Sequence, residues 1–449
     1  MKNIHIVSLG CPKNLVDTEV MLALLENAGY QVVEEPEQAD ILLVNTCGFI
    51  QPAVEEAVDE ILRLAEYKQN NEEVVLVVTG CMVQRYGAQL AEELPEVDIF
   101  LGVDEFPQIV NFLENKRQGE SMLAVGDESL YLMDASVPRK ISTPFFRAYL
   151  KITEGCDNHC TYCMIPSIRG RLRSRTIEDL TAEAQLLDSQ GVKELTLIAQ
   201  DLTAYGDDLK DGETSLVSLL QTLVNKTQIL WFRLLYLYPS SVDTSLLQLM
   251  AAQPRIVPYL DIPFQHVSDR VLKRMNRRYG LATLDDLVSR IRSFVPECAL
   301  RTTIMVGFPG ETEEDVDILT QALQKWQLDH VGVFQYQDEE GSIAANFADK
   351  VQEEEKAKRY AQVMSLQATI NKERQQRFVD KIEPVLIEGV SRESDLLLEG
   401  RTRFQAPDID GCVYITSGQV NPGDIVPVRI SEAHIYDLVG EVVPVKSME

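Results

Sequence analysis

The chain has 449 residues, 45% hydrophobic and 25% charged, as expected for a globular protein with roughly two to four domains. Its formal net charge of −28 repels phosphate backbones, so nucleic acid is not expected as the direct substrate and a basic protein is favoured as the partner. The 8 cysteines, with no signal-peptide pattern and no apolar run of membrane-spanning length, predict metal or redox chemistry in a reducing cytoplasm, not a disulfide framework.

Residues 1–118 alternate between strand-like and helical patterns. Strands are expected at residues 4–9, 41–45 and 74–78, and a helical pattern follows each of the first two. Alternation of this kind predicts an α/β domain in which helices cover a doubly wound parallel sheet.

Each of these three strands ends at a cysteine, namely Cys11, Cys47 or Cys81. The carboxyl ends of strands in an open α/β sheet line the crevice where ligands bind, so three thiolates could share one iron–sulfur cluster there. A single cysteine after a strand is most often a small buried residue, and an internal repeat could also produce the pattern. A glycine beside each cysteine would let the backbone approach a bulky cluster, and we favour the cluster.

Residues 119–141 show little periodicity and are interpreted as a linker to a second domain, residues 142–375. Helical stretches separate its strand candidates, which predicts a partial (β/α)6 barrel open at one side. The six expected strands are at residues 147–153, 194–199, 231–237, 259–264, 300–306 and 330–336.

The first strand of this barrel leads into the triplet Cys156, Cys160 and Cys163, with the spacing C-x3-C-x2-C. Three thiolates this close cannot all form disulfides, and structural zinc usually takes four protein ligands. His159 adjoins Cys160, where its ring cannot easily reach the same metal. A four-iron, four-sulfur cluster held by three cysteines leaves one iron open for a small molecule, and this interpretation is favoured.

Other loops at the same mouth carry polar residues or glycines. Gln200 follows the second strand, Gln265 and His266 follow the fourth, and Gly307 and Gly310 follow the fifth, where they would allow close approach of a ligand. Each could equally be a satisfied turn or cap, and His266 alone is better explained as a structural hydrogen-bonding residue.

One dense basic run, residues 169–175, interrupts the acidic chain with an arginine at every second position. Arginine binds carboxylate or phosphate through paired hydrogen bonds, so Arg169 and its neighbours could draw in an anionic group. A solvated loop would have the same composition, and the sequence leaves both possibilities open.

A charged helix at about 353–378 leads into short β-like runs, which predict a small antiparallel β-barrel of oligonucleotide-binding style over residues 376–445. Barrels of this kind often bind nucleic acid, but this segment contains more acidic than basic residues. Cys298 and Cys412 have no partner at ligand spacing and are interpreted as structural.

Taken together, the order of cysteines and domains resembles that of the radical S-adenosylmethionine methylthiotransferases over essentially the whole chain. Within that family, several strings resemble the RimO branch, which modifies a protein, more than the MiaB branch, which modifies transfer RNA. These strings are SLGCPKNLVD at 8–17, IPSIRG at 165–170, YLDIPFQH at 259–266 and VGVFQY at 331–336.

The resemblance implies that the C-terminal barrel is a TRAM domain and that the enzyme uses two [4Fe-4S] clusters. The cluster on Cys156, Cys160 and Cys163 would bind S-adenosylmethionine and cleave it to a 5′-deoxyadenosyl radical. The cluster on the three dispersed cysteines would carry the sulfur, and both would face a shared chamber. Tyr162, Gln200, Gln265 and the loop from Gly307 to Gly310 are the implied S-adenosylmethionine contacts.

By the same resemblance, the substrate is an aspartate of the small-subunit ribosomal protein uS12, thiomethylated at its β-carbon. A second S-adenosylmethionine would donate the methyl group. A low-potential electron donor of the flavodoxin or ferredoxin type and a sulfide source are the other expected partners, and no membrane is involved.

Two alternative functions remain open from the sequence. A transfer-RNA adenosine methylthiotransferase would need a basic terminal barrel and salt-sensitive RNA binding. An iron–sulfur electron carrier or redox sensor would need no S-adenosylmethionine pocket, and formation of 5′-deoxyadenosine would exclude it.

Overall fold

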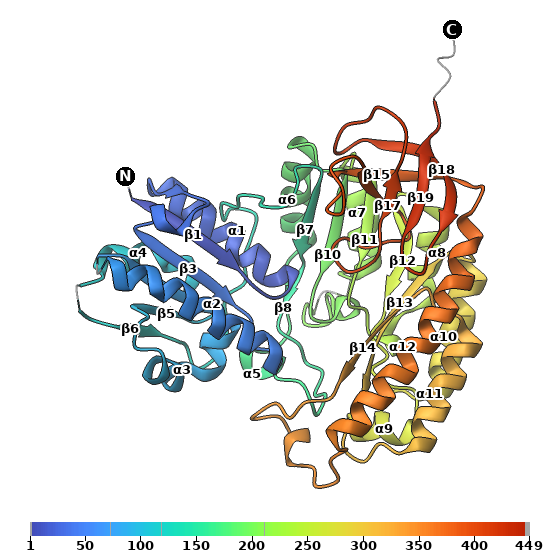
Figure 1. The fold of residues 1–449 in the computed structure, drawn as a ribbon, viewed down its shortest axis with the longest axis horizontal. Helices are drawn as coiled ribbons and strands as arrows, with labels where there is room; N and C mark the ends of the chain where they lie inside the picture. The colour runs from blue at the N-terminus through green and yellow to red at the C-terminus, as the bar shows by residue number, and fades with distance from the viewer. Residues whose placement is uncertain (1, 72, 118, 211, 445–449) are drawn as a thin grey trace.

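The computed structural model describes residues 2–71, 73–117, 119–210 and 212–444. Figure 1 shows the N-terminal domain (blue) beside a half-barrel (green to orange), with a small C-terminal barrel (red) over one end of the half-barrel strands. The fold class predicted from the sequence is confirmed in all three parts. Among the described residues, no helix is both long enough and apolar enough to cross a bilayer.

The N-terminal domain is a six-stranded parallel sheet in the order β2-β1-β3-β4-β5-β6. Its strands are β1 (Asn3–Ser8), β2 (Gln31–Val32), β3 (Ile41–Thr46), β4 (Val75–Gly80), β5 (Ile99–Leu101) and β6 (Met122–Ala124). Its helices are α1 (Pro12–Asn27), α2 (Gln51–Asn70), α3 (Cys81–Glu93) and α4 (Ile109–Asn115).

Both faces of this sheet are covered, because alternate residues of β3 enter different cores. Ile41 and Leu43 pack with α1 and α4, whereas Leu42 and Val44 pack with α2 and α3. The sheet is therefore doubly wound. β6 lies inside segment 119–141, which the sequence analysis assigns to a linker; a strand of three residues is too short to show a hydrophobic period.

All six strands expected for the second domain are present, and their spatial order follows the chain. They are β7 (Arg147–Lys151), β10 (Glu194–Ile198), β11 (Trp231–Leu234), β12 (Ile256–Asp261), β13 (Ala299–Val306) and β14 (His330–Gln335). Its helices are α5 (Ile165–Arg169), α6 (Ile177–Ser189), α7 (Leu216–Lys226), α8 (Thr244–Ala252), α9 (Asp269–Arg274), α10 (Leu281–Phe294), α11 (Glu313–Trp326) and α12 (Glu353–Gln375). β7 and β14 are the two edges of this sheet, so the barrel is open between them.

Two short strands, β8 (Thr153–Glu154) and β9 (Arg173–Ser174), pair in antiparallel fashion at the mouth of the half-barrel. They bring together the two ends of the loop that carries the cysteine triplet. Short 3-10 turns complete the fold: η1 (Pro36–Gln38), η2 (Phe106–Gln108), η3 (Leu202–Ala204), η4 (Pro239–Ser241), η5 (Ala344–Asn346) and η6 (Gln376–Phe378).

The C-terminal domain is a closed five-stranded barrel in the order β15-β16-β17-β19-β18. Its strands are β15 (Ile382–Val390), β16 (Leu398–Thr402), β17 (Val413–Ile415), β18 (Ile425–Ala433) and β19 (Leu438–Val442). Neighbouring strands are antiparallel except for β17 and β19, which are parallel.

This barrel is seated on the amino-terminal ends of the half-barrel strands through a buried ionic triad. The carboxylate of Glu194, the first residue of β10, lies 2.6 Å from Arg401 Nη2 of β16 and 2.6 Å from Arg233 Nε. Burial alone would raise the pKa of Glu194, but the two guanidinium groups lower it to about 2. The triad attaches the C-terminal barrel to the amino-terminal ends of the half-barrel strands, so this barrel does not cover their carboxyl-terminal ends.

Glu194→Gln is expected to destabilise the protein at pH 7 and to reduce the loss of stability that the protein shows as the pH falls. The stabilisation from a carboxylate with a lowered pKa is complete above its ordinary value of 4.5 and is lost as the pH falls toward about 2. The denaturation midpoint of the wild type should therefore fall more steeply over this range than that of the variant. Chemical denaturation checks this, with Glu297→Gln, whose side chain is 62% exposed, as control. Equal slopes would contradict the role given to Glu194.

Candidate functional site

Three cysteines, hereafter the sheet cysteines, follow three adjacent strands of the N-terminal sheet. Cys11 is the N-cap residue of α1 after β1, Cys47 follows β3, and Cys81 begins α3 after β4. The parallel pairing of β1 with β3 and of β3 with β4 brings their carboxyl ends to one edge. This edge includes the point between β1 and β3 where the strand order reverses, the usual ligand crevice of such a sheet.

The glycines beside the sheet cysteines serve the close packing of the loops themselves. A Cβ atom on Gly10 would lie 2.7 Å from Cys47 Cβ, and one on Gly48 would lie 2.6 Å from Met82 Cα. Gly10 also has φ of +90°, a conformation that side chains with a Cβ rarely adopt. Loops carrying larger residues could not bring the three thiols to one edge.

The second set, hereafter the barrel cysteines, is Cys156, Cys160 and Cys163 in the loop between β8 and α5. Each sulfur already has a hydrogen-bond donor. The backbone amides of Asn158 and Ile165 donate to Cys156 Sγ and Cys163 Sγ, and Arg277 Nη1 donates to Cys160 Sγ, each at 3.4 Å. Such donors favour the thiolate form of a metal ligand.

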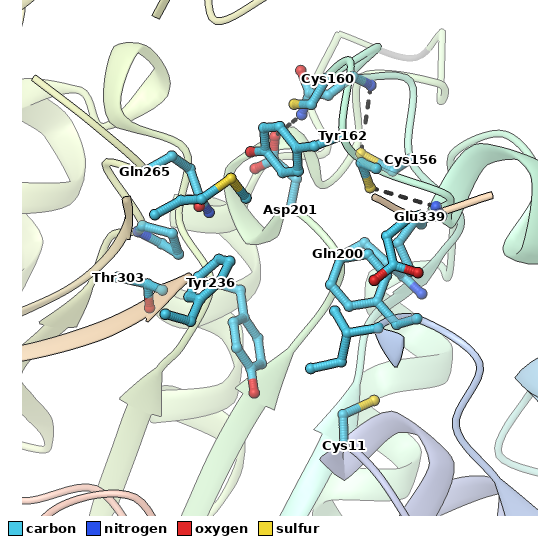
Figure 2. Close-up of a pocket in the computed structure, with 18 of the residues that line it drawn as sticks. Cys11, Cys156, Cys160, Tyr162, Gln200, Asp201, Tyr236, Gln265, Thr303 and Glu339 are labelled. Carbon is cyan, nitrogen blue, oxygen red and sulfur yellow. Dashed lines mark hydrogen bonds between the residues drawn. The ribbon is translucent and has the colours of Figure 1, made fainter. Parts of the chain in front are cut away.

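Both sets of cysteines line one cavity of about 690 Å³ between the two domains. In Figure 2, Cys156 and Cys160 lie on one side of this space and Cys11 on the other. Three residues predicted to contact S-adenosylmethionine, Tyr162, Gln200 and Gln265, also line it.

Two side-chain amides in the cavity are incompletely satisfied. The Oε1 atoms of Gln200 and Gln265 are buried and have no hydrogen-bond partner among the described residues. Gln265 also has φ of +66° and Tyr236 has φ of +65°, at the ends of the neighbouring strands β12 and β11. Unpaired buried acceptors and strained backbone gather at sites where a ligand completes the contacts.

Gly307 and Gly310, the two glycines predicted to contact S-adenosylmethionine, lie outside the cavity lining. Gly307 packs against Lys356 and donates its amide to Glu311, and Gly310 packs against Asp349 and Arg274. Neither residue is among those that line the cavity. Their left-handed backbone (φ of +75° and +82°) explains the glycines as turn residues.

His266 is buried, and its Nδ1 accepts a hydrogen bond from the backbone amide of Ser268 at 3.0 Å, in agreement with a structural role. Cys298 and Cys412 are free thiols outside the cavity lining.

Arg169 joins the two domains in a buried ionic network. Its Nη1 lies 2.8 Å from Asp17 Oδ2 and 3.3 Å from Glu154 Oε1. Its Nη2 donates to Asn14 Oδ1 at 2.6 Å, and its Nε donates to Cys81 Sγ at 3.3 Å. The hypothesis that Arg169 draws in a substrate carboxylate is therefore contradicted, because every nitrogen of its guanidinium group already has a partner.

Lys151 completes this network. Its ammonium contacts both Asp17 and Glu154, so two cations face two carboxylates. Burial would raise the pKa of Glu154, but Lys151 and Arg169 lower it to about 2, which keeps the carboxylate ionised. Glu154 also accepts from Gln200 Nε2 at 3.3 Å, so the network holds one of the cavity amides in place.

A third contact spans the opening of the half-barrel. Arg85 Nη1 of α3 lies 2.9 Å from Glu339 Oε2, in the loop after β14, and Gln51 N donates to Glu339 Oε1 at 2.9 Å. Glu339 lines the cavity, so this ion pair ties the two domains together at its rim.

The donor sets fit iron–sulfur clusters. Burial, followed by the charge of neighbouring cysteines, raises the pKa of Cys47 and of Cys163 to about 12. Such thiols ionise at neutral pH only against strong local positive charge, which iron supplies. Two sets of three soft ligands, each one short of a closed tetrahedral site, match clusters with an open iron.

Sequence reasoning did not single out Lys13, Tyr236 or Arg277, which also line the cavity. Tyr236 lies at the carboxyl end of a barrel strand, and this position could have identified it. Lys13 lies two residues after Cys11, and this proximity indicates a position near the site less clearly than the position of Tyr236 does. Arg277 approaches Cys160 only through tertiary folding.

Three protein families match the chain in succession. An uncharacterized protein family, UPF0004, matches residues 3–102, the radical SAM superfamily matches residues 150–322, and the TRAM domain matches residues 379–443. Among solved structures, the radical S-adenosylmethionine methyltransferase TsrM from Kitasatospora setae superposes with a TM-score of 0.52 at 15% identity, over 74% of this chain and 73% of that chain. At this identity, the likeness shows the fold alone.

Whole-length relatives are more informative. The chain is 55% identical to the ribosomal protein uS12 methylthiotransferase RimO of Desulfotalea psychrophila, over 98% of this chain and 99% of that protein. The proteins of the same name from Citrifermentans bemidjiense and Geobacter sulfurreducens are each 48% identical, over 98% of this chain and 98% and 99% of theirs.

Proposed function

Because this chain belongs to the RimO family of radical S-adenosylmethionine methylthiotransferases, we propose that it adds a methylthio group to the β-carbon of an aspartate in ribosomal protein uS12. One observation carries the proposal: two sets of three cysteines, from two domains, line a single cavity. Radical formation and sulfur delivery must reach the same substrate carbon, and a shared cavity allows this.

The barrel cysteines would hold one [4Fe-4S] cluster and the sheet cysteines a second. When bound, the clusters and S-adenosylmethionine supply the reducing electron, the radical, the sulfur and the methyl group. The amides of Asn158 and Ile165 and the guanidinium of Arg277 stabilise the thiolates of the barrel cysteines. The pair formed by Arg85 and Glu339 links the two domains that carry the two sets of cysteines.

Tyr162, Gln200 and Gln265 would orient S-adenosylmethionine, since all three line the cavity and the Oε1 atoms of both glutamines have no partner in the part of the chain that the structure describes. The net charge of −28 suits a basic protein substrate. A low-potential electron donor of the flavodoxin or ferredoxin type and a sulfide source would complete the reaction.

The decisive experiment is anaerobic incubation of cluster-reconstituted protein with reductant, S-adenosylmethionine and sulfide, together with both a uS12 peptide and transfer RNA. We expect mass spectrometry to find the methylthio group on the aspartate of the peptide alone. Modification of the RNA would support the transfer-RNA methylthiotransferase instead. Formation of 5′-deoxyadenosine excludes a simple electron carrier.

Gln265→Asn is expected to weaken S-adenosylmethionine binding about 10-fold, the effect of one lost hydrogen bond to a charged ligand. Asparagine tolerates the positive φ at this position, so the backbone should be retained while the acceptor is withdrawn by one methylene. Equilibrium dialysis of S-adenosylmethionine against cluster-loaded protein measures the change. An unchanged dissociation constant would remove Gln265 from the binding site.

A further inference from the structure

Three basic residues line the cavity: Lys13, Arg169 and Arg277. Each nitrogen of Arg169 has a partner, as described above. Arg277 donates to Tyr279 Oη at 2.5 Å, to Pro263 O at 2.8 Å and to Cys160 Sγ at 3.4 Å, so each of its nitrogens also has a partner. Lys13 differs from both, because its ammonium donates to a single acceptor among the residues that the structure describes.

Lys13 is the second residue of α1 and is only 9% exposed. Its Nζ donates to Ala199 O at 3.0 Å and lies 4.3 Å from the centre of the Tyr236 ring. An ammonium group has three N–H donors, so two remain available. The bond to Ala199, at the end of β10, holds this charge between the sheet cysteines and the mouth of the half-barrel.

This ammonium has no carboxylate within 4.0 Å among the residues that the structure describes, although acidic residues outnumber basic ones by 70 to 42 in the chain. Lys151, the other buried lysine of this region, contacts two carboxylates. The Asp261 carboxyl, which also feels the charge of Lys13, has its ion pair with Arg301 at 3.7 Å. A buried, unpaired ammonium is costly, and an anionic ligand would offset that cost.

We propose that the Lys13 ammonium binds the side-chain carboxylate of the substrate residue and thereby selects aspartate over asparagine. This inference rests on the proposed function, because it needs an acidic target residue. A carboxylate held here lies beside the sheet cysteines, which the proposed function assigns to sulfur delivery. The positive end of α1 adds to the attraction.

The test compares Lys13→Met, which keeps the length of the apolar stem, with Lys68→Met as control. Lys68 pairs with Asp98 at the opposite edge of the same sheet. Binding of fluorescent uS12 peptides with aspartate or asparagine at the target position is measured by anisotropy, without S-adenosylmethionine. We expect wild type and Lys68→Met to prefer the aspartate peptide by about 10-fold or more, and Lys13→Met to bind both peptides equally. Lys13→Arg, which keeps the charge, should retain the preference.

Iron content and the formation of 5′-deoxyadenosine from S-adenosylmethionine alone should be unchanged in Lys13→Met. Loss of either would overturn the inference, because Lys13 would then serve the clusters or the carboxylate of S-adenosylmethionine. If wild type methylthiolates the aspartate peptide and Lys13→Met keeps the preference for it, the inference is wrong and the proposed function stands. If wild type modifies no uS12 peptide, both are wrong.

Discussion

Replacing Cys47 with alanine is expected to abolish methylthio transfer and to leave formation of 5′-deoxyadenosine intact. Cys47 belongs to the sheet cysteines, and two thiolates are too few to hold a four-iron cluster firmly. The barrel cysteines lie on another domain and keep their own donors, so radical formation should continue. Iron should fall from about eight to about four atoms per chain if each set holds one four-iron cluster.

Cys412→Ala is the matched control, because Cys412 is a free thiol outside the cavity. Iron analysis and product mass spectrometry on anaerobically prepared protein measure both effects. Methylthio transfer by Cys47→Ala at the wild-type rate, or only about four iron atoms in the wild type, would contradict the assignment of two clusters.

Arg169→Met is expected to lower the free energy of unfolding by about 3–5 kcal/mol, the usual effect of breaking a buried ion pair from one side. The variant leaves Asp17 and Glu154 with Lys151 as their one remaining ion-pair partner in the network. It also removes the donor to Cys81 Sγ, so the iron content of the sheet site should fall as well. Chemical denaturation and iron analysis measure the two effects separately.

Arg171→Met is the control within the same basic run, since the Arg171 side chain is 87% exposed and that of Arg169 is 4% exposed. An exposed pair contributes about 0–1 kcal/mol, so this variant should match the wild type. Adding Asp17→Asn to Arg169→Met should restore part of the stability, because Lys151 then faces one carboxylate instead of two. Equal stability of the two single variants would show that the network does not hold the domains together.

The sequence predicted the long elements well, because their signal is local. The strands β1, β3 and β4 and the six strands of the half-barrel have the buried or alternating apolar pattern of parallel sheets. The strands β2, β5 and β6 have only two or three residues and were missed, since such a segment shows no period. Gly307 and Gly310 lie in turns outside the cavity lining, and a glycine in a turn looks the same in sequence whether or not a ligand lies near it.

The positions of the cysteines along the chain were enough to predict two sets of thiolates at the carboxyl ends of parallel strands, because strand direction fixes where the following loop lies. Only the tertiary structure decided what surrounds those thiolates. Arg169 and Lys13 are both basic residues near a cysteine in sequence, yet Arg169 pairs with two carboxylates and Lys13 has no carboxylate partner among the described residues. That difference arises from contacts with residues up to 186 positions away in the chain, and electrostatic interactions depend on distance in space, which the order of residues does not specify.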